Sequence, residues 1–299
     1  MSSDCPGPWR VSFHGGHSGE FCDHGEGALE EFVLAAVAAG CPAYGLTEHA
    51  PRIEPRFLFA EERALGWDVA HLERLFDRYA RRVDALAAQY GGRIVLFKGF
   101  EIEVVPRARY VEVMTGLRRE HAFDYIVGSV HYVDEIIIDY TRAEFDRAVA
   151  HCGGLEALAV RYYETLAEMA AALKPEIIGH FDLVRKQAAD EASVSTSRVR
   201  AAACAALDSV KEHGGILDVN TSGYRRGLGR PYPAPWVVRA ARERGIPFTF
   251  GDDSHRPSEV AADLDTARQY LLDLDVREII TFGRGPNGLE QRPISLLDP

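Results

Sequence analysis

Histidines and glycines are concentrated in one segment near the start of the chain, which reads FHGGHSGEFCDH from Phe13 to His24. His14, His17 and His24 lie within a span of eleven residues. Neutral imidazole is the commonest metal ligand at physiological pH, and glycines allow a loop to bend so that side chains converge on one point. The segment therefore indicates a metal site, and a polar loop with incidental histidines is the alternative.

Polar residues also follow six later apolar runs of the chain. Any one of them alone is explained by a helix cap or a hydrogen-bonded loop group. Together they bring a His, Asp or Glu to the end of each run, which favours one shared site. These residues are Glu48 and His49, Glu101 and Glu103, His131, His180 and Asp182, Asp218 and Asn220, and Asp252, Asp253 and His255.

The side chains in these loops select the kind of metal. Imidazole nitrogens with a few carboxylates suit Zn²⁺, Mn²⁺ or Fe²⁺, whereas Mg²⁺ and Ca²⁺ prefer oxygen. Seven of the eleven histidines, with two carboxylates, make more ligands than one tetrahedral ion needs, so we predict two or three divalent ions. Glu101 is the candidate for a bridging ligand. The nine candidates are His14, His17, His24, His49, Glu101, His131, His180, Asp253 and His255.

Short apolar runs alternate with longer amphipathic segments, as in parallel α/β proteins. The predicted strands are 9–13, 43–46, 94–100, 125–130, 176–179, 216–219 and 247–250. The predicted helices are 28–39, 68–89, 110–119, 142–150, 155–173, 195–213, 236–244 and 257–273. In a barrel all strand ends meet at one side, whereas an open sheet gathers ligands only where its strand order reverses. Because polar candidates follow nearly every strand, we predict a distorted (β/α)7 barrel, formed by residues 1–299 as a single domain.

One segment, 50–66, breaks the alternation. It carries two prolines and two phenylalanines before the next helix begins. It is either a lid over the predicted site or a plain surface connection.

Composition limits the partners and the compartment. A formal charge of −11 argues against non-specific binding to nucleic acid. The five cysteines are scattered and form no CxxC pair, which favours free thiols in a reducing compartment. No signal peptide or long apolar run is found, so we expect a cytoplasmic protein with no membrane span. The oligomeric state cannot be predicted.

These residues resemble the polymerase and histidinol phosphatase (PHP) superfamily, and most closely its histidinol-phosphatase branch. The resemblance spans the chain from His14 to Pro257 and rests on motifs that follow one another in the family's order. After the paired histidines come GLTEHAP (45–51), GFE (99–101), GSVH (128–131), GHFD (179–182), NTSG (220–223) and DSHRP (253–257). The resemblance implies a distorted (β/α)7 barrel with a trinuclear metal site, in agreement with the barrel predicted above.

The resemblance also implies how the ligands are shared. His14, His17, Glu101 and Asp253 would hold the first ion; Glu101, His131 and His180 the second; and His24, His49 and His255 the third. One departure concerns the first pair, because the family usually has His-x-His and this chain has His14-Gly15-Gly16-His17. Residues three apart on a strand point to opposite faces, so a bulge or loop at the glycines is needed to bring both to one ion.

The implied reaction is hydrolysis of L-histidinol phosphate to L-histidinol and phosphate, as in histidine biosynthesis. Divalent ions bind a phosphate dianion and lower the pKa of a bridging water, so we expect a metal-bridging hydroxide to attack phosphorus. Asp253 or a metal-bound water would protonate the leaving oxygen. Arg185, Arg225 and Arg256 are candidates for contacts to the small phosphorylated substrate.

Two other functions remain open from the sequence. The first is a PHP phosphoesterase that acts on another small phosphate ester or on a nucleotide. The second is a metal-stabilised module without catalysis, which the altered spacing at His14 favours and the complete set of candidate ligands opposes.

Overall fold

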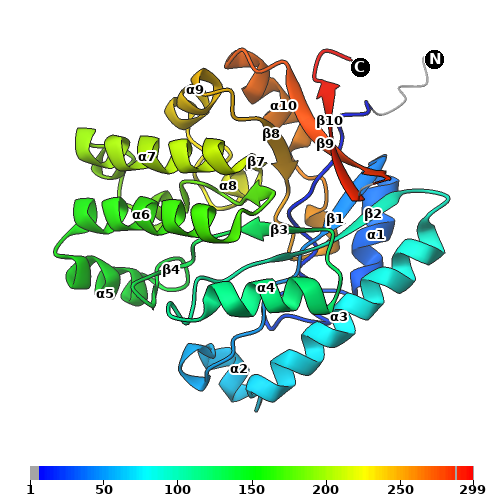
Figure 1. Cartoon of the computed structure of the whole chain (residues 1–299), viewed down its shortest axis with the longest axis horizontal. Coiled ribbons are helices and arrows are strands. Elements are labelled where there is room, and N and C mark those ends of the chain that lie inside the picture. Colours follow the sequence, from blue (N-terminus) through cyan, green and yellow to red (C-terminus); the bar gives the residue numbers. More distant parts are fainter. Residues whose placement is uncertain (1–6, 287, 299) are drawn as a thin grey trace.

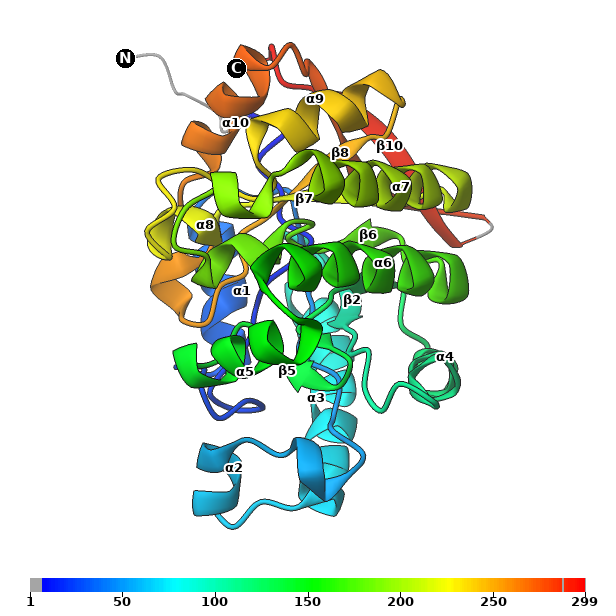
Figure 2. The same ribbon diagram turned by 90° about the vertical axis from the view of Figure 1, so that its left-hand side faces the viewer.

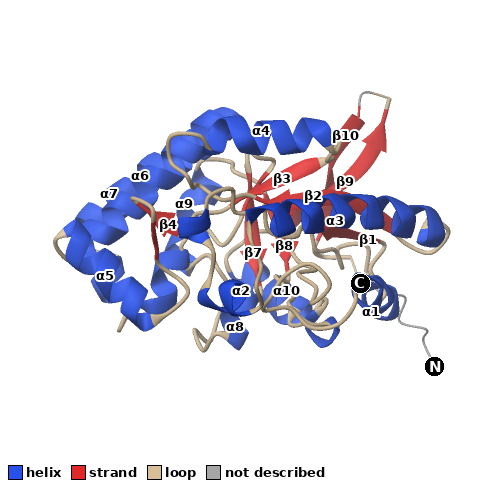
Figure 3. Cartoon of the chain, turned by 90° about the horizontal axis from the view of Figure 1, so that it is seen from below, coloured by secondary structure: helices blue, strands red, loops and turns tan. Residues whose placement is uncertain are grey.

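A curled sheet of six parallel strands forms the centre of the computed structural model, which describes residues 7–286 and 288–298. The strands follow one another in the order β1-β2-β3-β6-β7-β8, each paired in parallel with the next. Helices surround the strands (Figure 3). The strands are β1 (Ala43–Leu46), β2 (Val95–Glu101), β3 (Tyr125–Gly128), β6 (Ile177–Ile178), β7 (Ile216–Asn220) and β8 (Phe248–Gly251).

The segment that precedes the paired histidines closes this sheet into a barrel. Ser12 forms a parallel bridge with Tyr44 of β1, and its carbonyl oxygen accepts from the Gly45 amide at 2.8 Å. On its other side the Phe13 amide donates to the carbonyl of Phe250 in β8 at 2.9 Å. The predicted strand 9–13 is thus present as an extended segment with a single bridge pair, and the distorted (β/α)7 barrel is confirmed.

The helices lie close to their predicted ranges, with one exception. The range 257–273 was expected to be one helix, but it contains a 3-10 turn, η4 (Pro257–Glu259), and then α10 (Leu264–Asp273). Ala261 and Asp263 between them have positive φ angles of 57° and 61°, which end a right-handed helix. The other helices are α1 (Leu29–Ala38), α2 (Ala60–Ala64), α3 (Val69–Tyr90), α4 (Tyr110–Glu120), α5 (Arg142–Cys152), α6 (Leu155–Leu173), α7 (Ser197–His213), α8 (Ser222–Arg225) and α9 (Pro235–Glu243).

Local sequence sets the ends of the long helices. The Asp68 side chain caps α3 by accepting from the His71 amide at 2.7 Å, and Thr196 caps α7 through the Val199 amide at 3.3 Å. Helix α7 ends at Gly214, whose φ of 76° suits a residue without a side chain. Helix α3 runs along one side of the barrel, while α6 and α7 lie side by side on another (Figures 1 and 2).

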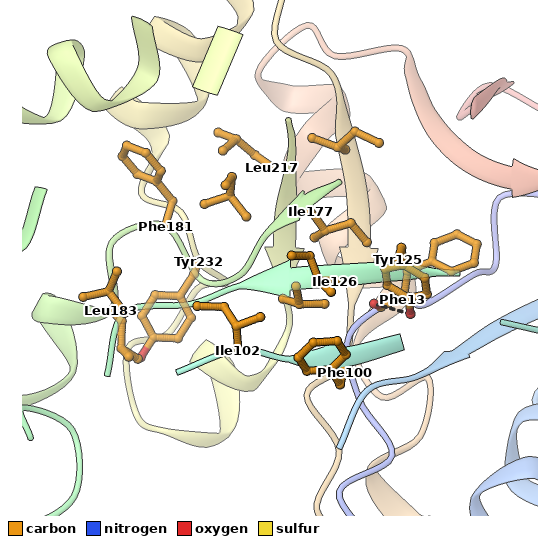
Figure 4. Packing of buried hydrophobic residues seen from close by; sticks show 14 of the residues in the cluster. Phe13, Phe100, Ile102, Tyr125, Ile126, Ile177, Phe181, Leu183, Leu217 and Tyr232 are labelled. Carbon is orange, nitrogen blue, oxygen red and sulfur yellow. Dashed lines mark hydrogen bonds between the residues drawn. The ribbon is translucent and has the colours of Figure 1, made fainter. Parts of the chain in front are cut away.

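A C-terminal hairpin that the sequence did not predict covers one end of the barrel. Strands β9 (Glu278–Gly285) and β10 (Gly288–Ser295) pair in antiparallel fashion. Phe282 of β9 packs at 4.7 Å between ring centroids on Phe13, and it also contacts Phe97 and Tyr125. Figure 4 shows the barrel interior beside this contact, where the Tyr125 hydroxyl donates to the Phe13 carbonyl at 2.9 Å. The hairpin therefore fixes the segment that carries the first histidines.

Three smaller features complete the description of the fold. A small hairpin of β4 (Tyr132–Val133) and β5 (Ile136–Ile137) follows β3. Among the described residues, no helix combines the length and the apolar character needed to cross a membrane. Four cysteines are free thiols, at positions 22, 41, 152 and 204, whereas Cys5 lies outside the described residues.

Candidate metal centre

Glu101, the last residue of β2, lies at the centre of the predicted ligands. Its Oε1 is 3.1 Å from His14 Nε2, 3.1 Å from His180 Nε2 and 3.3 Å from His131 Nε2. Its Oε2 is 2.9 Å from His49 Nδ1. Five chain segments far apart in the sequence thus meet at one buried carboxylate, because parallel strands deliver their carboxyl ends to one side of a barrel.

Three groups of side chains have ligand atoms within 4.8 Å of one another. Glu101 belongs to two of these groups, and His17 also belongs to two. The groups are His14, His17 and Glu101; Glu101, His131 and His180; and His17, His49 and His255.

Unpartnered nitrogens in these groups fit a metal. Both ring nitrogens of His17 and of His49, and Nε2 of His14, are buried and have no hydrogen-bond partner. A buried polar atom without a partner is costly. Divalent cations would satisfy these lone pairs, and neutral imidazole with a carboxylate is a suitable donor set for Zn²⁺, Mn²⁺ or Fe²⁺.

Burial and neighbouring charges act differently on the members of these groups. Burial lowers the pKa of His17 to about 4 and that of His255 to about 3, so both rings are neutral at pH 7. Burial would raise the pKa of Glu101, but His14 and His131 hold it well below its usual value. Despite burial, Glu101 and Asp218 raise the pKa of His14 well above its usual value, and Glu103 and Glu101 do the same for the pKa of His131. The shifts therefore separate neutral rings at positions 17 and 255 from rings that are paired with carboxylates at positions 14 and 131.

The unusual spacing of His14 and His17 does not separate them. Gly16 has a φ of 84°, a left-handed conformation that interrupts the extended alternation of side chains between the two histidines. Both rings consequently face Glu101. His14 Nε2 lies 3.1 Å from Glu101 Oε1, and His17 Nε2 lies 3.9 Å from Glu101 Oε2. The loop that the altered spacing required is therefore present.

Asp253 and His24 lie at the edge of the cluster. Asp253 Oδ1 is 3.6 Å from His17 Nε2, and Ser222 Oγ donates to its Oδ2 at 3.0 Å. His14, His255 and Arg226 overcome the effect of burial and hold the pKa of Asp253 well below its usual value. His24 is outside the three groups; its exposed ring lies 5.2 Å from that of His49, centroid to centroid.

The centre opens into a cavity of about 490 Å³. Segment 50–66, with η1 (Pro55–Phe57) and α2, forms part of its wall, because Arg52, Phe59 and Glu61 all line the cavity. The Phe59 ring stacks on Tyr140 at 5.0 Å between centroids. The segment is therefore more than a connection on the surface.

The three predicted arginines lie in different surroundings. Arg185 does not line the cavity, because its Nε pairs with the buried Asp182 carboxylate at 2.7 Å. Arg225 lines the cavity, but it also donates to the carbonyls of Asp252 and Asp253. Arg256 is exposed at the mouth and pairs with Glu26 at 3.2 Å and with Glu259 at 3.3 Å.

Sequence reasoning missed Arg226. It lines the cavity and has no ion pair within 4.0 Å among the described residues. No signal in the sequence separates it from the adjacent Arg225, since only the fold shows which guanidinium is committed to loop carbonyls.

Three acidic residues predicted at strand ends, Glu48, Glu103 and Asp182, also lie in different surroundings. Glu103 lines the cavity, and its Oε1 lies 3.0 Å from His131 Nδ1. Glu48 and Asp182 face the protein interior instead, and neither lines this cavity. Sequence reasoning overlooked four carboxylates that do line it, Asp23, Glu61, Asp139 and Glu259.

Comparison with known proteins agrees with this geometry. The sequence model of the PHP domain matches residues 15–222. The chain belongs to the PHP family. Within that family it is 32% identical to the "Probable histidinol-phosphatase" of Schizosaccharomyces pombe, over 93% of this chain and 91% of the relative.

Two solved structures share the fold of this PHP chain. A protein from Listeria monocytogenes assigned to the histidinol phosphatases superposes with a TM-score of 0.74 at 26% identity, over 86% of this chain and 99% of that one. A histidinol phosphate phosphatase from Lactococcus lactis superposes with a TM-score of 0.70 at 18% identity, over 92% and 97% of the two chains. The Lactococcus structure holds zinc, L-histidinol and phosphate.

Proposed function

We propose that this PHP protein is a metal-dependent phosphomonoesterase, a hydrolase that converts L-histidinol phosphate to L-histidinol and phosphate. The observation that carries the proposal is the cluster of buried histidines around the ionised Glu101, beside a cavity large enough for a small phosphate ester. The histidinol-phosphatase relative, which aligns with nearly the whole chain, supports the choice of substrate.

The proposed ligands form three sets, two of which share Glu101. His14, His17, Glu101 and Asp253 would hold one ion, Glu101, His131 and His180 a second, and His24, His49 and His255 a third. Two or three ions of Zn, Mn or Fe are the proposed cofactors. Bound cations of this kind supply positive charge for the phosphate and an activated water.

The surrounding side chains suit the two ends of the substrate. Arg226, which has no ion pair in the described part of the chain, is proposed to bind phosphate oxygens, together with Arg225 on the cavity wall and Arg256 at the mouth. The substrate's amine and imidazole require acceptors, and Glu61 and Asp23 lie on the cavity wall for this purpose.

Asp253 is the group we assign to proton movement. Its carboxylate lies at the edge of the cluster, 3.6 Å from His17 Nε2, where it could accept a proton from the water that attacks phosphorus and return it to the histidinol oxygen as the phosphorus–oxygen bond breaks. Ser222 keeps the carboxylate in place through its hydrogen bond.

The test is phosphate release from L-histidinol phosphate by protein that has been stripped with chelator and reloaded with Mn²⁺, Zn²⁺ or Fe²⁺. We expect metal-dependent turnover that is selective over a nucleoside monophosphate. His131→Ala should abolish it, whereas His213→Ala, at the end of α7, is the matched histidine control. Equal turnover of every monoester would contradict the substrate and favour another PHP phosphoesterase activity.

A further inference from the structure

Position 15 has no room for a side chain. A Cβ atom built on Gly15 would lie 2.1 Å from Asp252 Oδ1 and 2.9 Å from the Tyr44 hydroxyl. Side chains two residues apart on an extended segment face the same side, so position 15 would be the simplest place for a second ligand beside His17. Because no side chain fits there, the first histidine of the segment is displaced to position 14, from which it reaches Glu101.

A carboxylate on β7 holds the displaced ring. Asp218 Oδ2 lies 2.7 Å from His14 Nδ1, and both side chains are fully buried. An ionised carboxylate can only accept a hydrogen bond, so Nδ1 must carry the proton in this contact. In a neutral His14 ring the lone pair then lies on Nε2, the nitrogen that faces Glu101 Oε1 at 3.1 Å.

Asn220 fixes the carboxylate in turn. Its Oδ1 accepts from the Ser222 amide at 3.0 Å, and this contact orients its Nδ2 toward Asp218 Oδ2 at 2.9 Å. Asn220 and Asp218 are two residues apart on one strand, so their side chains lie on the same face. The two β7 residues therefore form a rigid support behind His14.

We propose that Asp218 is the positioning residue that makes the displaced His14 a metal ligand, by accepting its Nδ1 proton and directing its Nε2 toward Glu101. Asn220 supports Asp218 in this role. The inference rests on the proposed metal centre but not on which phosphate ester is the substrate.

The test compares metal binding by the unmodified protein and by Asp218→Asn. The amide keeps the shape of the side chain but can donate to Nδ1, which favours a proton on Nε2 and removes the ligand. Changes to groups that orient a metal-binding histidine weaken metal affinity by about 10- to 100-fold. We expect a loss of that size in titrations with chelator-buffered Zn²⁺. Glu176→Gln is the matched control, a carboxylate that holds the Ile126 amide and Arg118 far from the centre.

A double variant separates positioning from a structural role. In a His14→Ala background, Asp218→Asn should weaken Zn²⁺ binding no further, because the residue acts through His14. An undiminished effect in that background, or unchanged affinity in the single variant, would overturn the proposal.

Nitrogen NMR of the unmodified protein gives an answer even where the variants do not fold. The proposal requires the proton of His14 on Nδ1 in the zinc-loaded protein, and a proton on Nε2 would overturn it. The role of Asp218 and the proposed substrate are tested separately. A protein that loses zinc in Asp218→Asn but does not hydrolyse L-histidinol phosphate would support this inference and contradict the proposed substrate.

Discussion

Replacing Glu101 by glutamine should remove most of the stability that metal ions give to the folded protein. Glu101 contributes to two of the three donor groups, whereas the group of His17, His49 and His255 does not include it. Glutamine has the same shape, but its amide lacks the negative charge that a bridging ligand supplies. The variant should therefore keep one metal-binding group of three.

The magnitude follows from mass action. A site held at a free metal concentration a thousandfold above its Kd stabilises the folded state by about 4 kcal/mol, so three groups filled independently give about 12 kcal/mol. Unfolding entropy of about 2.1 cal/mol/K per residue converts 1 kcal/mol to about 1.6 °C for a chain of 299 residues. Binding of metal ions should therefore raise the Tm of the unmodified protein by about 20 °C and the Tm of the Glu101→Gln variant by about 6 °C.

Differential scanning calorimetry on chelator-stripped and reloaded protein measures both values. Glu176→Gln, a carboxylate outside the centre, should show the full rise on loading. An equal rise in Glu101→Gln and in the unmodified protein would refute a ligand role for Glu101. No rise in either protein would refute the metal centre itself.

Three further predictions test other parts of the structure. Arg226→Ala should lower kcat/KM for L-histidinol phosphate by about 10- to 100-fold, because a hydrogen bond to a charged group contributes about 1.5–3 kcal/mol. Arg256→Ala should lower it by less, and steady-state assays of phosphate release compare the two variants. Gly45→Ala should destabilise the fold by about 1–3 kcal/mol in urea unfolding, because the added Cβ would lie 2.0 Å from the Tyr125 hydroxyl. Gly92→Ala, with open space around the added methyl group, should leave the stability unchanged. Equal effects of the two substitutions would contradict the packing. Burial raises the pKa of the Cys41 thiol to about 12, so the reactive thiolate is the main form only above that pH. Mass spectrometry after treatment with iodoacetamide at pH 8 should therefore find Cys41 unmodified. Rapid labelling of the folded protein would contradict the burial of this thiol.

The barrel could be predicted from the sequence because its strands are short apolar runs with polar residues at their ends. Range 43–46 coincides with β1, whose residues are all buried, and the long amphipathic range 68–89 differs from α3 by one residue at each end. Periodicity is strongest in such segments. The C-terminal hairpin was missed because its strands are partly exposed, and its main buried anchor, Phe282, is a single aromatic residue that sets no pattern.

The candidate ligands could be predicted by residue type, but their contacts could not. Whether His14 reaches Glu101 depends on the φ of Gly16, which a sequence does not encode as a pattern. Arg185 looked available because it follows a strand, yet a buried carboxylate three residues earlier neutralises it. Arg226 was overlooked for the opposite reason, because only the fold shows that its neighbour is committed to backbone carbonyls.

The contact between Phe282 and Phe13 also has a consequence for the order of assembly during synthesis. Phe13 precedes His14 directly, and its ring packs on a hairpin made from residues 278–295. The Trp9 indole likewise donates to the carbonyl of Asp298 at 3.2 Å. A nascent chain on the ribosome therefore lacks this support for its first histidines until residues 278–298 have been translated.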